Sequence, residues 1–330
     1  MSLATVKSML SRPALPEGTT STRVKNLIGD YGILLVFAVV IIYLSFTAPN
    51  FLTTDNLINI VRQSSIIGFI AVGMTFVMIT GGIDLSVGSV VGLTGVVAAT
   101  LAPAGGSSFI WAIVAGIIIG VAVGFINASF VVWGSIMPFL ATLAMMSVVR
   151  SAALIFTNGQ PVSGLNDSFQ WLGTGAFGPI PVPVVIFFIV AIIADFALSQ
   201  TKFGKHVYAV GGNGESAKKV GISVKKVLVS VYLIAGTLAA VAGLVLTSRV
   251  DGADPLAGEM FELQAISAVV VGGTSLTGGR GTVRGTILGV LLIGVVLNGM
   301  NLLNVSSYYQ KAVQGLILVL AVLLNRWKSD

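Results

Sequence analysis

Long apolar runs dominate this chain and limit what it can fold into. A membrane-spanning helix needs about 20 mostly apolar residues, and ten segments approach that length. They cover residues 31–48, 57–80, 86–102, 109–132, 135–156, 182–199, 227–249, 261–275, 285–303 and 309–325. Only 9% of the 330 residues are charged, against about 25% in soluble domains. The sequence therefore predicts an all-α membrane protein of about ten transmembrane helices, because lipid offers the backbone no hydrogen bonds.

Basic residues predict how these helices are oriented. The segment 199–226 contains Lys202, Lys205, Lys218, Lys219, Lys225 and Lys226, whereas the loop 158–180 has no Lys or Arg. The positive-inside rule places the first in the cytoplasm and the second outside, together with the loop 250–259. An even number of spans puts both termini in the cytoplasm, in agreement with Lys7, Arg12, Arg23 and Lys25 near the start and Arg326 and Lys328 near the end.

This pattern divides the chain into three parts. We expect residues 1–30 to form a flexible cytoplasmic tail, residues 31–326 the transmembrane domain with its cytoplasmic loop at 200–226, and residues 327–330 a short cytoplasmic end. The first 30 residues lack a short apolar core followed by a small-residue cleavage site, so no signal peptide is predicted.

Glycine patterns suggest where helices pack and where they break. The spacing G-x-x-x-G, which lets helix backbones touch, occurs at Gly88/Gly92, Gly120/Gly124 and Gly285/Gly289. Two further segments, GGIDLSVG at 81–88 and GGTSLTGG at 272–279, share the frame G-G-x-x-L-[S/T]-x-G. Each follows an apolar run and precedes a glycine-spaced helix, and six intervening spans make the two copies parallel. Chance similarity is the alternative in a chain with 40 glycines.

Broken helices in corresponding positions indicate the central pathway of a transporter. On this basis the candidate pathway residues are Gly81, Gly82, Asp84, Ser86, Gly272, Gly273, Thr274, Thr277, Asn298 and Asn301. A charge at bilayer depth costs at least about 2.5 kcal/mol and persists where it faces protein or water. Asp84 or Ser86 is expected to cap the helix that follows, which is compatible with shaping the break near the pathway.

Three polar residues have a structural alternative. Asn298 and Asn301 are three apart and share a helix face, which could bind a hydroxylated solute or another helix, and we favour the helix. Asp195 is expected to pair with a lysine of the cytoplasmic loop.

The sequence offers no nucleotide, metal or catalytic site. A Walker loop needs G-x-x-x-x-G-K-[S/T], and the pair Gly204-Lys205 is followed by His206. With zero cysteines and one histidine, no thiolate or histidine-rich metal centre is predicted. We therefore expect that the chain binds no cofactor and is not an enzyme. The energy for transport must come from a partner or an ion gradient.

The segment 212–221, GNGESAKKVG, has turn residues at its start, a helix-compatible middle and a glycine at its end. These features predict a short surface helix. It is either a simple topology determinant or a docking helix for a cytoplasmic motor.

Three separated motifs resemble the ribose-type permeases of bacterial ABC sugar importers. They are GMTFVMITGGIDLSVGSVVGLTG, YAVGGNGESAKKVGI and AISAVVVGGTSLTGGRGTVRGTILG followed by NLLNVSSYYQKAVQGLILVLAV. The resemblance extends from about Tyr31 to Arg326. It implies a homodimeric permease in the bacterial inner membrane, a cytoplasmic ABC ATPase subunit and a periplasmic binding protein that delivers a monosaccharide, with ribose the first expectation. It also assigns coupling to the ATPase to Asn213, Glu215, Ser216, Ala217, Lys218 and Gly221.

The resemblance further implies alternating access, in which movement of the ATPase changes the side on which the broken helices open. The main alternative is a secondary carrier or facilitator for a polar metabolite. Other pentoses, hexoses, inositol or a furanosyl compound are alternatives to ribose.

Overall fold

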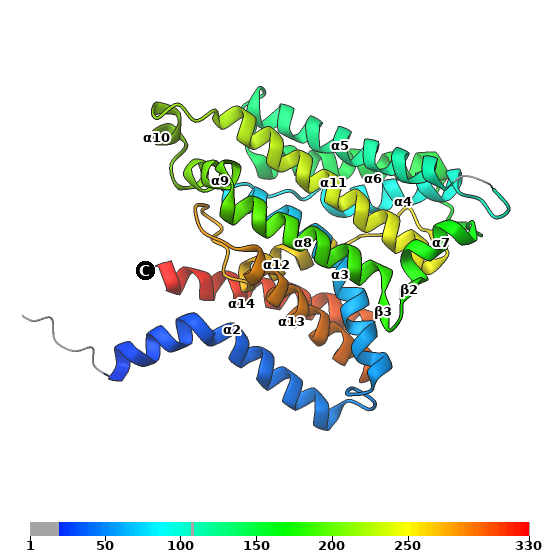
Figure 1. Ribbon diagram of the computed structural model, residues 1–330, viewed down its shortest axis with the longest axis horizontal. Helices are drawn as coiled ribbons and strands as arrows, with labels where there is room; N and C mark the ends of the chain where they lie inside the picture. Colours follow the sequence, from blue (N-terminus) through cyan, green and yellow to red (C-terminus); the bar gives the residue numbers. More distant parts are fainter. Residues whose placement is uncertain (1–19, 107–108, 330) are drawn as a thin grey trace, which may run out of the picture.

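The computed structural model describes residues 20–106 and 109–329 as a bundle of helices (Figure 1). Within that part of the chain, six helices are long and apolar enough to cross a membrane. They are α3 (Thr54–Ile79), α5 (Ile110–Val132), α6 (Pro138–Thr157), α8 (Val182–Gln200), α11 (Val224–Val250) and α13 (Val283–Leu302). The predicted class of helical membrane protein is thereby confirmed.

Four further helices carry shorter apolar stretches: Ile33–Thr47 in α2 (Thr20–Thr47), α4 (Val87–Leu101), α12 (Phe261–Val271) and Ser307–Leu323 in α14 (Ser307–Ser329). Each predicted apolar segment falls on one of these helices or on one of the six longer ones, and the number that cross the bilayer stays a prediction. α2 already begins at Thr20, ahead of the predicted first span. The rest of the predicted tail, residues 1–19, and Asp330 at the other end lie outside the described residues.

The centre of the bundle is α3. Its residues Phe69, Ile70, Met74 and Val77 are completely buried, and α11 and α13 pack against it. At the periphery, apolar side chains face outward instead, as at Ile193 of α8, which is 62% exposed. This distribution is the one expected in lipid, where an exposed apolar side chain needs no partner.

The G-x-x-x-G pairs are close packing faces. A Cβ atom on Gly120 or Gly124 of α5 would meet the backbone of α11 at Gly236 and Tyr232. In the same way, Gly285 and Gly289 of α13 lie against the backbone of α12, and Gly88 and Gly92 of α4 lie against the loop before α12. The glycines therefore set the distances between neighbouring helices.

Short strands join the two loops that are predicted to lie outside the cell. β1 (Val162–Ser163) pairs antiparallel with β4 (Gly252–Ala253), with Val162 opposite Ala253. Beside them, α7 (Asp167–Thr174) is followed by the hairpin of β2 (Ala176–Phe177) and β3 (Ile180–Pro181). We call this end of the bundle the ribbon face.

The opposite end carries α9 (Lys202–Gly212) and α10 (Gly214–Lys219), and we call it the α10 face. The start of α2 and the end of α14 lie at the same end in Figure 1. The loops that the positive-inside rule assigns to opposite sides of the membrane thus occupy opposite faces of the bundle.

Candidate functional site

The two glycine-broken segments meet at the α10 face. The chain leaves α3 through Gly81 (φ +80°) and leaves α12 through Gly273 (φ +93°), both in the left-handed region that favours glycine. Farther along the second loop, the amide of Gly279 donates to the carbonyl oxygen of Ile79 at 2.8 Å. Because both loops follow helices that end at this face, the two copies run parallel, as predicted.

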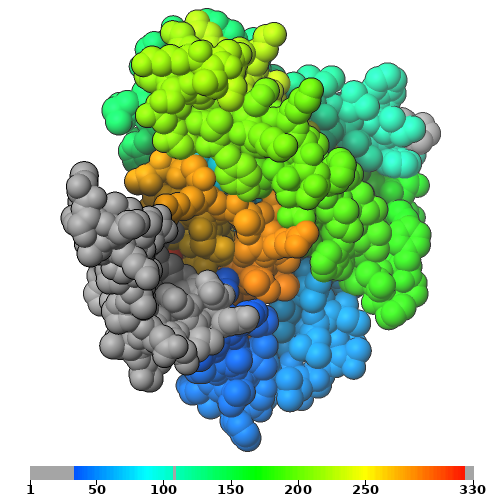
Figure 2. Space-filling model, turned by 60° about the vertical axis from the view of Figure 1, so that its left-hand side comes forward, coloured from blue at the N-terminus to red at the C-terminus, as the bar shows by residue number. Residues whose placement is uncertain are grey.

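The end of α9 completes this contact. A Cβ atom on Gly211 would clash with the carbonyl oxygen of Ile79 and lie 2.7 Å from the nitrogen of Gly279. A Cβ atom on Gly278 would lie 2.9 Å from the oxygen of Gly211. We call the contact of Ile79, Gly211 and Gly279 the three-way junction. Figure 2 shows this region, with the α9–α10 segment in yellow-green above the orange loop that follows α12.

Tyr208 adds a side-chain link beside the three-way junction. Its hydroxyl donates to the carbonyl oxygen of Gly281 at 2.7 Å. Burial raises the pKa of this hydroxyl, and the negative charge of Asp195 raises it further. Tyr208 therefore keeps its proton and remains a donor at physiological pH.

Asp84 organises the first break from a fully buried position, with 1% of its surface exposed. Its Oδ1 accepts from the amide of Ser86 at 2.9 Å and from the hydroxyl of Ser86 at 2.6 Å. From α5, Nδ2 of Asn127 donates to the Ser86 hydroxyl at 2.8 Å and lies 3.4 Å from Oδ2 of Asp84. From α6, the hydroxyl of Thr142 donates to the carbonyl of Ile83 at 3.1 Å.

The predicted side-chain cap of α4 is not formed, because Asp84 accepts from the amide and hydroxyl of Ser86 and from no amide within Val87–Leu101. Ser86 is the N-cap residue of α4 but makes no side-chain cap; its hydroxyl donates to Asp84 and accepts from Asn127. Next to it, a Cβ atom on Gly82 would lie 2.8 Å from the hydroxyl of Tyr232. The break is therefore held by side chains from α5, α6 and α11 as well as by its own residues.

The second break is held mainly by its own loop. The hydroxyls of Ser275 and Thr277 lie 2.8 Å apart, and Thr274 is completely buried. Gly272 touches the backbone of Gly285 in α13.

Asn298 and Asn301 have different surroundings although they share a helix. Asn298 pairs with Asn56 of α3 through two reciprocal amide hydrogen bonds of 2.8 and 3.0 Å. Asn301 accepts from Nε2 of Gln310 at 2.8 Å and lines a cavity. The structure thus uses Asn298 to join two helices, the role favoured from the sequence.

The short helix predicted within 212–221 is present as α10. The Oδ1 of Asn213 caps it by accepting from the amide of Ser216 at 2.8 Å, and Gly221 (φ +86°) follows its end. Ala217 is buried against the bundle. The side chains of Asn213, Glu215, Ser216 and Lys218 are exposed on the surface of this segment.

Val220 is a surface residue that the sequence interpretation missed. It is 76% exposed directly after α10, in a loop that is otherwise polar. Its signal in the sequence is a lone branched apolar residue between Lys219 and Gly221. A single exposed apolar side chain is common on protein surfaces, and Val220 is of interest because it lies next to α10.

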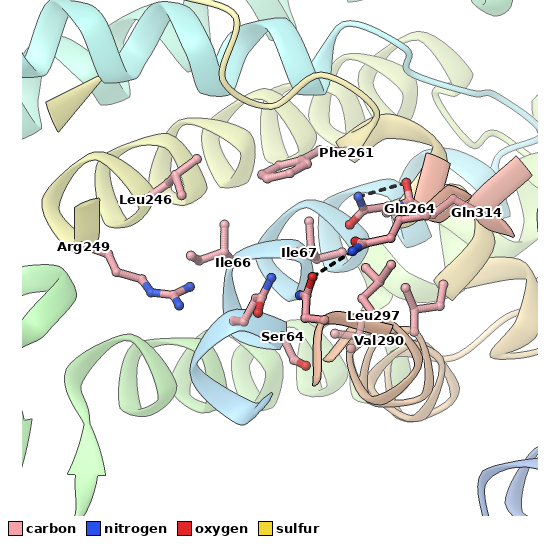
Figure 3. A pocket seen from close by; sticks show the side chains of 15 residues that line it. Ser64, Ile66, Ile67, Leu246, Arg249, Phe261, Gln264, Val290, Leu297 and Gln314 are labelled. Atoms are coloured by element: carbon pink, nitrogen blue, oxygen red, sulfur yellow. Dashed lines mark hydrogen bonds between the residues drawn. The ribbon is translucent and has the colours of Figure 1, made fainter. Parts of the chain in front are cut away.

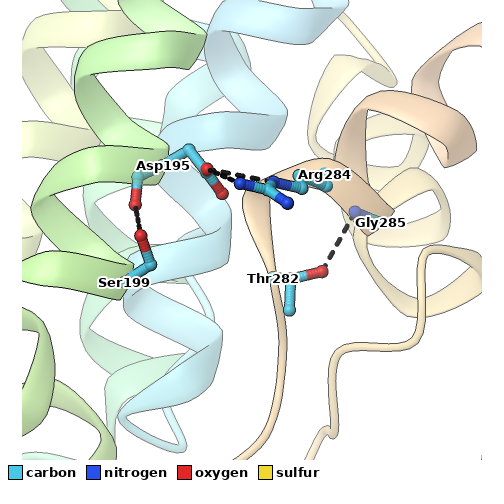
Figure 4. A network of polar contacts seen from close by, with 5 residues as sticks. All are labelled: Asp195, Ser199, Thr282, Arg284 and Gly285. Atoms are coloured by element: carbon cyan, nitrogen blue, oxygen red, sulfur yellow. Dashed lines mark hydrogen bonds and ion pairs between the residues drawn. The ribbon is translucent and has the colours of Figure 1, made fainter.

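Asp195 forms an ion pair, but with a different partner from the predicted loop lysine. Its Oδ2 lies 3.0 Å from Nη2 of Arg284 and accepts from Nε at 3.1 Å (Figure 4). Arg284 lies in the first turn of α13, two residues after Thr282, whose hydroxyl caps that helix by accepting from the amide of Gly285 at 3.0 Å. The pair therefore joins α8 to α13 beside the second break.

Near the ribbon face, a cavity of about 170 Å³ lies between α3, α11, α12, α13 and α14 (Figure 3). Its polar lining residues are Gln63, Ser64, Arg249, Gln264, Asn301, Gln310 and Gln314. Of these, only Asn301 was a pathway candidate from the sequence. The missed signal is a set of glutamines inside apolar segments, two of them four residues apart at Gln310 and Gln314 and so on one helix face.

Comparison with known proteins finds matches over most of the chain. Residues 56–322 match the family described as branched-chain amino acid transport system / permease component. The chain is 47% identical over 293 residues to the ribose import permease protein RbsC of Bacillus subtilis, which covers 88% of this chain and 91% of that protein. It is 39% identical over 297 residues to the D-allose transport system permease protein AlsC of Escherichia coli, covering 90% and 91%. No solved structure matches the chain.

Proposed function

The chain belongs to this family of transport-system permease components, and from that premise we propose that it is the permease subunit of an ABC importer for a monosaccharide. Ribose is the first candidate, because the relative with 47% identity is a ribose import permease. Relatives with 42% and 39% identity carry the names of L-arabinose and D-allose permeases. A sugar therefore fits the most similar relatives better than the amino acids in the family description.

We assign the α10 face to the cytoplasm, because it carries the lysine-rich segment. With ten spans, both termini lie on that side, and the ribbon face is periplasmic. The protein is then a multi-pass component of the bacterial inner membrane. Its partners are a second copy of the permease, a cytoplasmic ABC ATPase subunit and a periplasmic sugar-binding protein.

The observation that carries this proposal is the position of α10 next to both helix breaks. α10 is exposed, and it follows Gly211, which contacts both Ile79 and the loop at Gly279. An ATPase that binds Glu215, Lys218 and Val220 therefore moves a segment in direct main-chain contact with the end of α3 and with the loop between α12 and α13. The chain needs no nucleotide site of its own in this mechanism.

The two breaks are the proposed gates of an alternating-access cycle. Interfaces between packed elements switch between discrete arrangements instead of deforming continuously. Asp84, Ser86 and Asn127 keep the first break in shape while the three-way junction opens and closes. Gly81, Gly82, Gly272, Gly273, Thr274 and Thr277 belong to the moving loops in this proposal.

Reconstitution in proteoliposomes tests the function. We expect uptake of radiolabelled ribose only when the chain is combined with its ATPase, its binding protein and ATP. Uptake must stop when a non-hydrolysable ATP analogue replaces ATP. Sugar movement by the chain alone contradicts the proposal and supports a secondary carrier or facilitator. Leucine uptake in place of sugar uptake supports an amino-acid permease instead.

A further inference from the structure

We propose that Arg150 of α6 is a positioning residue for transport, which clamps the segment 254–260 against α4 and releases it when the ribbon-face half of the bundle changes its arrangement. Nη1 of Arg150 donates to the carbonyl oxygens of Pro255 at 2.7 Å and of Ala257 at 2.8 Å. We call these two hydrogen bonds the Arg150 clamp. The inference rests on the proposed function, because release of the clamp has a role only if the chain transports a solute.

The segment 254–260 enters the bundle from the ribbon face without helical structure, and we call it the re-entrant segment. It begins directly after β4 and ends where α12 starts at Phe261. α12 has 11 residues and is therefore about 16 Å long, close to half of the 30 Å hydrocarbon layer of a bilayer. Because α12 ends at the second break near the α10 face, the re-entrant segment reaches the middle of the bundle.

Non-helical backbone at this depth must be buried in protein or line a water-filled cavity. Two amides of the re-entrant segment are satisfied locally. The amide of Ala257 donates to the carbonyl oxygen of Asp254 at 2.9 Å, and the amide of Leu256 donates to Oδ1 of Asp254 at 2.7 Å. For the carbonyl oxygens of Pro255 and Ala257, the donor is Arg150. The clamp thus supplies hydrogen bonds that a helix would make within its own backbone.

The glycine face of α4 makes room for the clamp. A Cβ atom on Gly92 would lie 2.7 Å from Nη1 of Arg150 and 2.9 Å from each of the two carbonyl oxygens that Nη1 binds. One turn earlier, a Cβ atom on Gly88 would clash with the carbonyl oxygen of Gly258 and with Oε2 of Glu262. The re-entrant segment therefore lies directly on the backbone of α4.

The guanidinium of Arg150 is a costly group to place inside a membrane bundle. Charged side chains at such positions are rare, face protein or water, and mark functional sites in membrane proteins. The carboxylates of Asp254, Glu259 and Glu262 act on this guanidinium electrostatically. In the described part of the chain, however, none of the three forms an ion pair with it. The clamp can therefore open without the separation of an ion pair.

The backbone at the end of the re-entrant segment is held in a strained conformation. Met260, the last residue before α12, has φ +70°. A residue other than glycine is uncommon in this left-handed region. Such conformations persist where the surrounding structure imposes them, and they cluster at clamps and switch regions. Since α12 follows directly, a change at Met260 alters the direction in which α12 leaves the segment.

The clamp joins the two helices that flank the helix breaks. α4 follows the first break, and α12 leads into the second break at Gly272. At the α10 face, the same two breaks are joined in the three-way junction between Ile79 and Gly279. One end of α12 is therefore fastened by the junction and the other by the clamp. A movement that opens the junction is transmitted along α12 to the clamp.

Thiol labelling tests whether Arg150 holds the re-entrant segment, because the sequence contains zero cysteines. Spheroplasts with the complete importer are treated with a charged methanethiosulfonate reagent that does not cross the membrane. Ala257→Cys should be labelled about tenfold faster in combination with Arg150→Met, since two hydrogen bonds to a charged group are lost. Gln160→Cys, at an exposed position of the ribbon-face loop, should be labelled equally with and without Arg150→Met. An unchanged labelling rate at residue 257 overturns the proposal.

Gly92→Ala disturbs the clamp from the side of α4. Its Cβ atom would lie 2.7 Å from Nη1 of Arg150, so this variant should also speed the labelling of Ala257→Cys although Arg150 is present. If Arg150→Met does not reach the membrane, the Gly92→Ala variant decides the question. An unchanged labelling rate in that variant then contradicts the clamp.

Uptake kinetics test whether the clamp serves transport. Arg150→Met should lower the maximal uptake rate about tenfold, and Arg150→Lys, which keeps the charge and the donors, should restore part of it. The KM for sugar-loaded binding protein should stay the same, because Arg150 lies seven residues, about 10 Å, before the ribbon-face end of α6. A changed KM at an unchanged maximal rate would assign the segment to docking and overturn the positioning role.

Lys311→Met is the matched control for the uptake measurements. It removes a cation that pairs with Glu259 of the re-entrant segment at 3.6 Å, but this pair is exposed and should contribute little. Uptake by this variant should equal that of the wild type, and a loss equal to that of Arg150→Met would contradict a specific role of the clamp. If the unmodified importer takes up no sugar, the proposed function fails, whereas the labelling still shows whether Arg150 holds the segment.

Discussion

The amide of Gly279 donates to the carbonyl oxygen of Ile79 across 2.8 Å, and this bond joins two loops from opposite halves of the sequence. Gly211 packs against both atoms, so that no side chain fits between them. The contact consists of main chain only. Movement of any one of the three segments must therefore displace the other two.

The first prediction concerns the three-way junction. Gly211→Ala places a Cβ atom against the carbonyl oxygen of Ile79, and overpacking of this kind costs about 1–3 kcal/mol. We expect the variant to lose most of its sugar uptake and to have a lower melting temperature in detergent. Gly212→Ala is the matched control, because a Cβ atom there meets nothing within 4 Å. Equal uptake by the two variants would show that the junction is not a tight contact in the working protein.

The second prediction concerns docking of the ATPase. Glu215→Arg and Val220→Asp change exposed side chains at α10 and should abolish sugar-stimulated ATP hydrolysis by the complex while the permease stays folded. Gly221→Trp is less suitable, since Gly221 has φ +86° and a side chain there strains the backbone. Lys225→Glu, in the first turn of α11 and in the same lysine-rich segment, is the control. Normal stimulation in both α10 variants would place the docking surface elsewhere.

The third prediction concerns Asp84. Asp84→Ala leaves the amide and the hydroxyl of Ser86 without their acceptor, at a cost of about 1–3 kcal/mol. We expect lower thermal stability and lower uptake. Asp84→Asn keeps one oxygen as an acceptor and should lie between Asp84→Ala and the wild type. Asp55→Ala changes an exposed carboxylate in the first turn of α3 and serves as the control. Unchanged uptake and protein level in Asp84→Ala would exclude a role for this carboxylate in shaping the break.

The fourth prediction concerns Tyr208. Tyr208→Phe removes the hydrogen bond to Gly281 and should cost about 0.5–1.5 kcal/mol. The raised pKa of this tyrosine means that its contribution is complete below the unfolded value of about 10 and is lost only as the pH rises through the higher folded value. The stability difference between wild type and variant should therefore be constant from about pH 6 to 9. A difference that changes within this range would point to another titrating group.

The fifth prediction concerns Asp195 and Arg284. The side chain of Arg284 is 82% exposed, and exposed ion pairs contribute about 0–1 kcal/mol. Asp195→Ala and Arg284→Ala should each change the free energy of unfolding by no more than that, and the double variant should resemble either single one. A loss of uptake that is restored by exchanging the two residues would instead give the pair a functional role.

Hydropathy placed the helices well because the need to satisfy backbone hydrogen bonds in lipid acts locally on each segment. It was less accurate at their ends. The segment predicted at 261–275 stops as a helix at Val271, since Gly272 and Gly273 break it. Similarly, α2 begins ahead of residue 31 because the helix includes residues 20–30, which are largely polar and so give no hydropathy signal.

Contacts between distant segments were harder to predict. The similarity of the two glycine segments suggested a relationship, but nothing local indicates that Gly211 would pack between them. The partner of Asp195 was missed for the same reason, because α13 approaches α8 only after the bundle is assembled. The glutamines of the cavity are scattered over three helices, and only their shared surroundings distinguish them from ordinary polar residues.

The three-way junction consists only of main-chain groups, and this has a consequence for how such proteins diversify. Substitutions away from the three-way junction leave this contact unchanged, since it requires only that glycine be kept at a few positions. Related permeases can therefore carry different nutrients and still share the same opening mechanism.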